Sequence, residues 1–150
     1  MLLFKLLGLL LILGVCVVSG FLKADVLKKR SEKLQKNLEA LNRLGELVRI
    51  GSYEIEELVM LCFSADTVAV EKGHIKMSGE YLLKEDIKIL EDFFGGFGMA
   101  DREAEYERTK LFYSLLENQY SAALGVYGQL GRLYRSIGFM GGLILCIFLM

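Results

Sequence analysis

The sequence predicts an all-α protein in which a helical-bundle domain lies between an N-terminal and a C-terminal transmembrane helix. Residues 6–22 and 137–150 carry no charged side chain, proline is absent, and one segment shows a heptad repeat. A charge at mid-bilayer costs several kcal/mol, and roughly 20 apolar residues span the hydrocarbon. We therefore expect membrane helices at residues 1–22 and 136–150 and a single domain at residues 23–135.

Basic residues beside the two apolar segments predict the orientation of the domain. Six basic residues lie between positions 23 and 36, and Arg132 and Arg135 precede the second apolar segment. Because lysine and arginine accumulate on the cytoplasmic side of membrane helices, we expect a cytoplasmic domain with both termini across the membrane. The alternative is that residues 1–20 are a cleaved signal peptide.

The first half of the domain reads as two helices and a less regular segment. Apolar residues at 27, 34, 38, 41, 44, 47 and 48 predict one long helix, continuous with the first membrane segment, that ends at Gly51. Acidic residues at 54, 56 and 57 then favour the start of a second helix. For residues 64–80 we expect a short helix plus a loop, although Val68 and Val70 also suit a strand.

The second half reads as a helix over residues 82–94, which stops at the glycines of residues 95–98, and a long helix with Asp101 as its N-cap. In the long helix a tyrosine recurs at every seventh position, with a second seam residue three positions later. This a/d seam runs into the second membrane segment. We interpret its tyrosines as core residues, with an exposed docking surface as the alternative. The tyrosines are Tyr106, Tyr113, Tyr120, Tyr127 and Tyr134, and their partners are Thr109, Leu116, Ala123, Leu130 and Ile137.

Small residues occur at helix-packing spacing in both membrane segments. Cys16 and Gly20 are four residues apart in the first segment, as are Gly138 and Gly142 in the second. Small residues at this spacing allow two helices to approach closely. Neither segment holds a carboxylate, histidine or arginine at mid-depth, so no proton or ion pathway is predicted.

The residues that could carry chemistry form no catalytic set. The chain has one histidine, which excludes a Ser-His-Asp triad. The pair Glu71-x-x-His74 has the spacing of di-iron ligands, but such a site needs two such pairs and two further glutamates. Three cysteines form no disulfide framework, and Cys62 lies on an apolar stripe. We therefore expect no enzymatic activity, no metal and no cofactor.

The expected partners are membrane lipid and other proteins, which can include further copies of this chain. The net charge of −1 argues against a nucleic-acid partner. The start of the long helix offers four acidic residues as candidates for binding a basic partner: Asp101, Glu103, Glu105 and Glu107. Asp101 and Glu103 suit a helix N-terminus, whereas Glu105 and Glu107 lie farther along and are expected to be exposed charges.

The C-terminal half resembles a known family. The residues that carry the resemblance are LEDFFGGFG at 90–98, Asp101 at the start of a long helix, and LYRSIGFMGGL at 133–143. Over residues 83–150 the chain resembles stage III sporulation protein AB. Two features depart from that family: Glu105 stands where a glutamine is usual, and residues 51–58 lack the proline of a T-P-L-x-E-A-like stretch.

The resemblance implies a part of the channel-like complex that links the mother cell and the engulfed forespore, in the mother-cell membrane around the forespore. It also implies that the soluble domain is similar to the cytoplasmic domain of platform protein F of type II secretion systems. In that analogy the domain docks a secretion-type ATPase, stage III sporulation protein AA. We therefore predict a non-enzymatic, membrane-anchored assembly platform. The alternative is a general coiled-coil membrane scaffold of a secretion or division complex outside sporulation.

Overall fold

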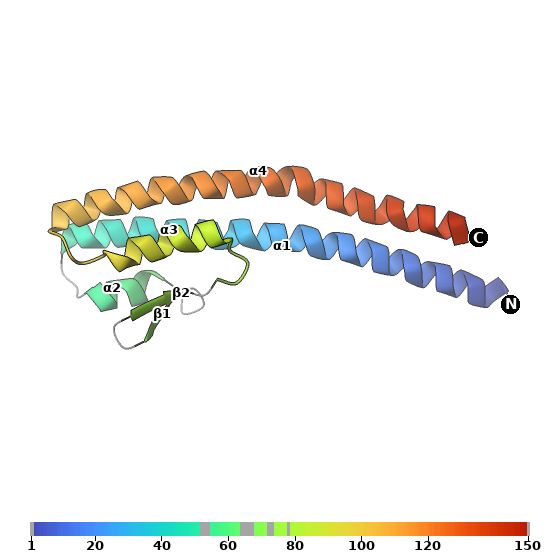
Figure 1. Ribbon diagram of the computed structural model, residues 1–150, viewed down its shortest axis with the longest axis horizontal. Coiled ribbons are helices and arrows are strands. Elements are labelled where there is room, and N and C mark those ends of the chain that lie inside the picture. Colours follow the sequence, from blue (N-terminus) through green and yellow to red (C-terminus); the bar gives the residue numbers. More distant parts are fainter. Residues whose placement is uncertain (1, 52–54, 64–67, 72–73, 78, 150) are drawn as a thin grey trace. The chain divides into compact units, whose positions relative to one another are not determined.

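The part of the chain that the structure describes forms four helices and two strands. A computed structural model describes residues 2–51, 55–63, 68–71, 74–77 and 79–149. In chain order the elements are α1 (Leu2–Ile50), α2 (Ile55–Cys62), β1 (Val68–Glu71), β2 (His74–Met77), α3 (Lys84–Gly95) and α4 (Arg102–Leu149) (Figure 1). The fold is thus mainly helical, which confirms the predicted class.

The chain divides into two compact units. The smaller unit comprises Met1–Ser31 with Ala123–Met150, and the larger unit is Glu32–Ala122. Helices α1 and α4 each continue from one unit into the other. The division at residues 31 and 123 does not mark membrane boundaries, so the ends of the membrane helices at residues 22 and 136 stay predictions.

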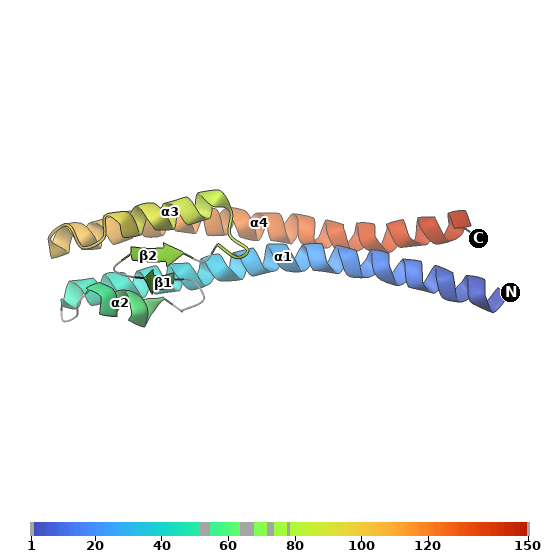
Figure 2. The same cartoon turned by 60° about the horizontal axis from the view of Figure 1, so that its bottom comes forward.

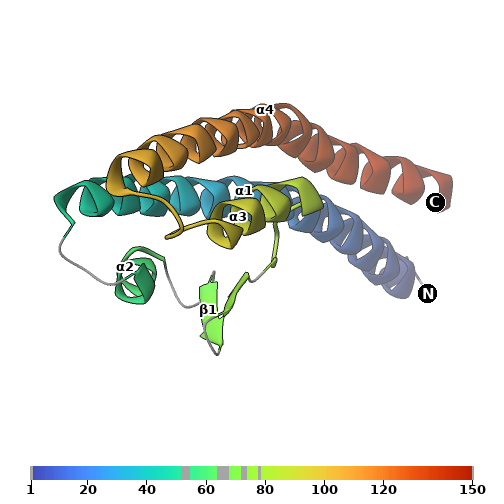
Figure 3. The ribbon, with the colours of Figure 1, turned by 60° about the vertical axis from the view of Figure 1, so that its left-hand side comes forward.

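Within the larger unit α1 and α4 run antiparallel. The Tyr120 hydroxyl donates to Gln35 Oε1 at 3.4 Å, and the Arg102 Nη2 group donates to the Gly51 carbonyl at 3.1 Å. Residue numbers therefore rise along one helix as they fall along the other. In this unit α2 and β1 lie on the side of α1 that faces away from α4 (Figures 1 and 3).

The core of the larger unit is built from apolar stripes on all four helices. Phe93 of α3 meets Phe112 of α4 with ring centroids 5.5 Å apart, and Phe94 meets Phe63 at 5.2 Å. The large buried apolar residues of the helices are Leu34, Leu38, Leu41, Leu44 and Val48 of α1, Leu58 and Val59 of α2, Leu90, Phe93 and Phe94 of α3, and Leu116 of α4. Removal of this apolar surface from water holds the helices together.

The segment predicted as a short helix plus a loop forms two strands instead. β1 and β2 pair antiparallel, with Val68 opposite Met77 and Glu71 opposite His74. The helix prediction is therefore wrong for Val68–Glu71 and His74–Met77, and residues 64–67, 72–73 and 78 of the same prediction lie outside the described residues. The physical reason is the β-branched Val-Ala-Val run of β1, together with a glycine between the strands that disfavours a continuous helix.

The smaller unit is a pair of helix segments (Figure 2). Its surface is mainly apolar over residues 7–22 and 136–148. Leu10 and Ile147 are each 74% exposed, and Phe148 is 91% exposed. The buried positions are small residues: Gly20, Ala24, Ser31, Ala123, Gly131 and Gly142. A water-soluble helix pair would bury its large apolar side chains, so this arrangement fits a helix pair surrounded by lipid.

Candidate functional site

The four small residues predicted to pack membrane helices lie together in the smaller unit. A Cβ atom built on Gly20 would lie 2.6 Å from the Tyr134 carbonyl oxygen and 3.3 Å from Gly138 Cα. A Cβ atom on Gly142 would lie 3.3 Å from Cys16 Cβ. The backbones of α1 and α4 therefore touch at these positions, which leaves no room for a larger side chain.

The same helix contact continues toward the two ends of the chain. The Cys146 thiol donates to the Leu9 carbonyl at 3.4 Å, which adds one polar contact between α1 and α4. Polar contacts of this kind stabilise helix pairs in lipid, where no water competes for the carbonyl.

Two arginines lie at the edge of the second apolar segment and point away from it. The Arg132 Nε group donates to the Gly128 carbonyl at 3.2 Å, and the Arg135 Nε group donates to the Gly131 carbonyl at 3.0 Å. Both side chains run back along α4 by four residues, toward the polar part of the chain. This direction is the one that keeps an arginine head group at the water interface of a membrane helix.

The tyrosines of the predicted seam lie at its edges. Leu116 and Ala123, which follow two of the tyrosines by three positions, are 0% and 3% exposed. Tyr106, Tyr113, Tyr120 and Tyr127 are half-buried, and Tyr134 is 37% exposed. At three of the five pairs the buried position is the second residue, Thr109, Leu116 or Ala123, whereas Leu130 and Ile137 are 37% and 56% exposed.

The four acidic candidates at the start of α4 separate into two kinds. Asp101, Glu103 and Glu107 are exposed, whereas Glu105 is only 4% exposed. The expectation that Glu105 is an exposed charge is therefore wrong. Its Oε1 atom accepts the backbone N–H groups of Gly98 at 2.9 Å and Ala100 at 3.2 Å, which fixes the turn before α4.

A second side chain of α4 holds the other end of this turn. Arg108 Nη2 donates to the carbonyls of Asp92 at 2.7 Å and Phe93 at 3.1 Å, at the C-terminal end of α3. A guanidinium group at this end adds a donor to carbonyls of the last helical turn and complements the negative end of the helix dipole. Residues 95–101 are thereby held between Arg108 and Glu105.

Gly98 lies in this turn with φ of 87°, a left-handed conformation that other residues adopt at a cost. Met99, the next residue, is 84% exposed. The turn therefore presents an apolar side chain and the exposed carboxylates of Asp101 and Glu103 on a fixed backbone.

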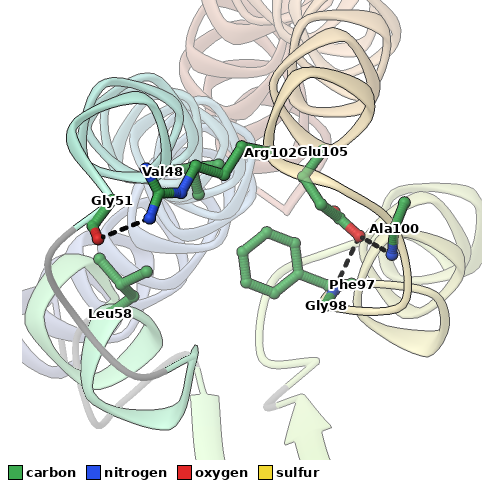
Figure 4. A pocket seen from close by; sticks show the side chains of 8 residues that line it. All are labelled: Val48, Gly51, Leu58, Phe97, Gly98, Ala100, Arg102 and Glu105. Carbon is green, nitrogen blue, oxygen red and sulfur yellow. Dashed lines mark hydrogen bonds between the residues drawn. The ribbon is translucent and has the colours of Figure 1, made fainter.

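A pocket of about 190 Å³ opens beside the turn (Figure 4). The residues that line it are Val48, Gly51, Leu58, Phe97, Gly98, Ala100, Arg102 and Glu105. Arg102 and Glu105 both come from the first turns of α4, yet their head groups point to different sides: Arg102 to the Gly51 carbonyl and Glu105 to the turn (Figure 4).

The cysteine, histidine and glutamate candidates show no catalytic arrangement in the described ranges. Burial raises the pKa of the Cys62 thiol, an effect that Arg43 partly offsets, so the reactive thiolate is disfavoured. Glu71 and His74 lie on paired strands and do not share a helix face. Over the residues described, no group of three or more metal-ligating side chains could hold a metal ion.

The class of protein follows from these two units. Two helices are long and apolar enough to cross a membrane by length and composition, and each also contributes to a polar helical unit. The family model of stage III sporulation protein AB matches residues 64–150, so the chain belongs to that family. Membership and the two apolar helices together indicate a sporulation-related membrane protein. No curated protein and no solved structure matches the chain.

Proposed function

We propose that this protein is a non-enzymatic, membrane-anchored platform of a sporulation complex. Residues 1–22 and 136–150 cross the membrane, residues 23–135 lie in the cytoplasm, and the start of α4 docks an ATPase like stage III sporulation protein AA. The observation that carries the proposal is the turn at residues 95–101, which Glu105 and Arg108 hold in one conformation.

A held turn is a good docking surface because its shape does not have to be ordered when a partner binds. Asp101, Glu103 and Glu107 give this surface exposed carboxylates, of which Glu107 lies 3.7 Å from the Lys110 ammonium group, and Met99 gives it an apolar contact. Acidic groups on such a surface steer a basic partner and mainly increase its association rate. The partner expected here therefore presents a basic face with an apolar recess.

The membrane part of the proposal is supported by the smaller unit. Its apolar side chains are exposed, its helix contact uses small residues, and Arg132 and Arg135 point toward the polar part of the chain. Six basic residues at 23–36 favour the cytoplasmic side for the region between the apolar segments.

The docking proposal can be tested by measuring ATPase binding to the full chain in lipid nanodiscs. Glu103→Lys combined with Glu107→Lys should lower the association rate about tenfold at low salt, and the effect should fade as salt screens the charges. A matched control, Glu91→Lys with Glu117→Lys, makes the same charge change at exposed positions elsewhere in the larger unit.

Both double variants should melt close to the parent, because exposed charges contribute little to stability. Binding of the ATPase with the same rate to both double variants would remove the start of α4 from consideration. Glu105 is left out of this test because its side chain holds the turn.

A further inference from the structure

Glu105 has a carboxylate oxygen that the fold leaves without a partner. Its Oε1 atom accepts two backbone N–H groups, but Oε2 is buried and has no hydrogen-bond partner within the described part of the chain. A charged oxygen that is removed from water and left unpaired is costly. This oxygen can therefore accept a hydrogen bond from a donor on another molecule.

The pocket beside this carboxylate has the size of one long side chain. Its volume is about 190 Å³, below the roughly 300–1,000 Å³ that is typical of small-molecule sites. Val48, Leu58 and Phe97 give it apolar walls, and Glu105 is its acidic residue. A lysine or arginine side chain combines an apolar stem with a charged donor at its end.

The neighbouring cation does not already satisfy the carboxylate. Arg102 also lines the pocket, but its guanidinium donates to the Gly51 carbonyl on the other side (Figure 4). A Cβ atom on Gly51 would meet this guanidinium, so the absence of a side chain at position 51 leaves room for Arg102. The Arg102 guanidinium thus donates its hydrogen bond to the C-terminal end of α1 and not to Glu105.

We propose that this pocket receives a single lysine or arginine side chain of the protein partner, with its stem against Val48, Leu58 and Phe97 and its charged group on Glu105 Oε2. The inference deepens the proposed docking function and rests on it for the identity of the partner. The exposed acids Asp101, Glu103 and Glu107 would then attract the partner, whereas Glu105 would anchor it.

The pocket can be tested without the partner by using n-butylammonium, which reproduces the end of a lysine side chain. The full chain in nanodiscs is titrated at constant ionic strength, and the amide resonances of Gly98 and Ala100 are followed by NMR. We expect these resonances to shift saturably with n-butylammonium and not with n-butanol, which has the same stem and no charge. Equal responses to the two probes, or shifts that grow linearly, would overturn the proposal.

Glu105→Gln is the informative variant because an amide oxygen can still accept the two backbone N–H groups. The variant should melt near the parent yet bind n-butylammonium with an affinity about tenfold lower. Glu117→Gln removes the same charge from an exposed residue of α4 outside the docking surface and should leave probe binding almost unchanged. Equal weakening by both variants would mean that the probe senses only the overall charge.

The pocket and the docking function can fail separately. If n-butylammonium binds through Glu105 but the ATPase does not bind the chain, the pocket stands and the partner is a different basic protein. If the ATPase binds the parent and Glu105→Gln equally well, while Glu103→Lys with Glu107→Lys weakens it, docking stands and the pocket proposal is wrong.

Discussion

Replacing Gly20 by alanine should weaken the contact between α1 and α4 in the smaller unit, whereas replacing Gly14 should not. A Cβ atom on Gly20 would lie 2.6 Å from the Tyr134 carbonyl oxygen, and one on Gly14 would meet nothing within 4 Å. Ordinary contacts begin near 3.4 Å, so the two backbones must separate by about 0.8 Å. The atom in the way belongs to the backbone, so no flexible side chain can yield.

The size of the effect follows from comparing the two variants. Each gains about 1 kcal/mol of helix propensity when alanine replaces glycine, and this gain cancels in the comparison. Overpacking of a close contact costs about 1–3 kcal/mol. Gly20→Ala should therefore be less stable than Gly14→Ala by about 1–3 kcal/mol, which is roughly 5- to 150-fold in the equilibrium between paired and separated helices.

The assay is separation of the helices in the full chain by SDS titration of mixed micelles. Energy transfer between dyes attached near the two chain ends reports pairing, since Leu9 and Cys146 are in contact. Equal midpoints for the two variants, or a more stable Gly20→Ala, would show that the backbones do not touch here.

Two further predictions concern the same helices. Gly142→Cys should form a disulfide with Cys16 on oxidation, because a Cβ atom at position 142 would lie 3.3 Å from Cys16 Cβ, near the range of natural disulfides. Gly141→Cys should not form this disulfide. Nonreducing electrophoresis of the full chain measures the disulfide yield, and similar yields for both variants would contradict the contact. In the larger unit, Leu116→Ala should lower the free energy of unfolding by about 2–5 kcal/mol, because Leu116 is fully buried. Tyr120→Ala should lower it by no more than about 1.5 kcal/mol, because Tyr120 is half-buried. Thermal unfolding followed by circular dichroism checks this order, and a larger loss for Tyr120→Ala would place the tyrosines in the core.

Most helix boundaries could be predicted because local chemistry sets them. Gly51 ends α1 with φ of 73°, and Asp101 precedes α4, whose first backbone bond runs from Glu105 N–H to the Asp101 carbonyl. These are properties of one or two residues and their immediate neighbours. Apolar spacing then indicated which face of α1 would be buried.

The role of Glu105 could not be predicted, because it depends on the path of the turn. Its carboxylate reaches back to the N–H of Gly98, seven positions earlier, and helix spacing says nothing about such a contact. The heptad likewise showed a periodic face without showing which seam position points to the core. In β1, Val68 and Val70 suited either a strand or a buried helix, and pairing with β2 decided between them.

The claim that a cytoplasmic domain is held between two membrane helices is tested most directly by reporter fusions in living cells. Alkaline phosphatase, which is active only outside the cytoplasm, is fused after Met150 or inserted within residues 64–80. The account predicts an active enzyme after Met150 and an inactive one within residues 64–80. Activity within residues 64–80 would contradict the cytoplasmic placement of the docking surface and would favour an exported domain.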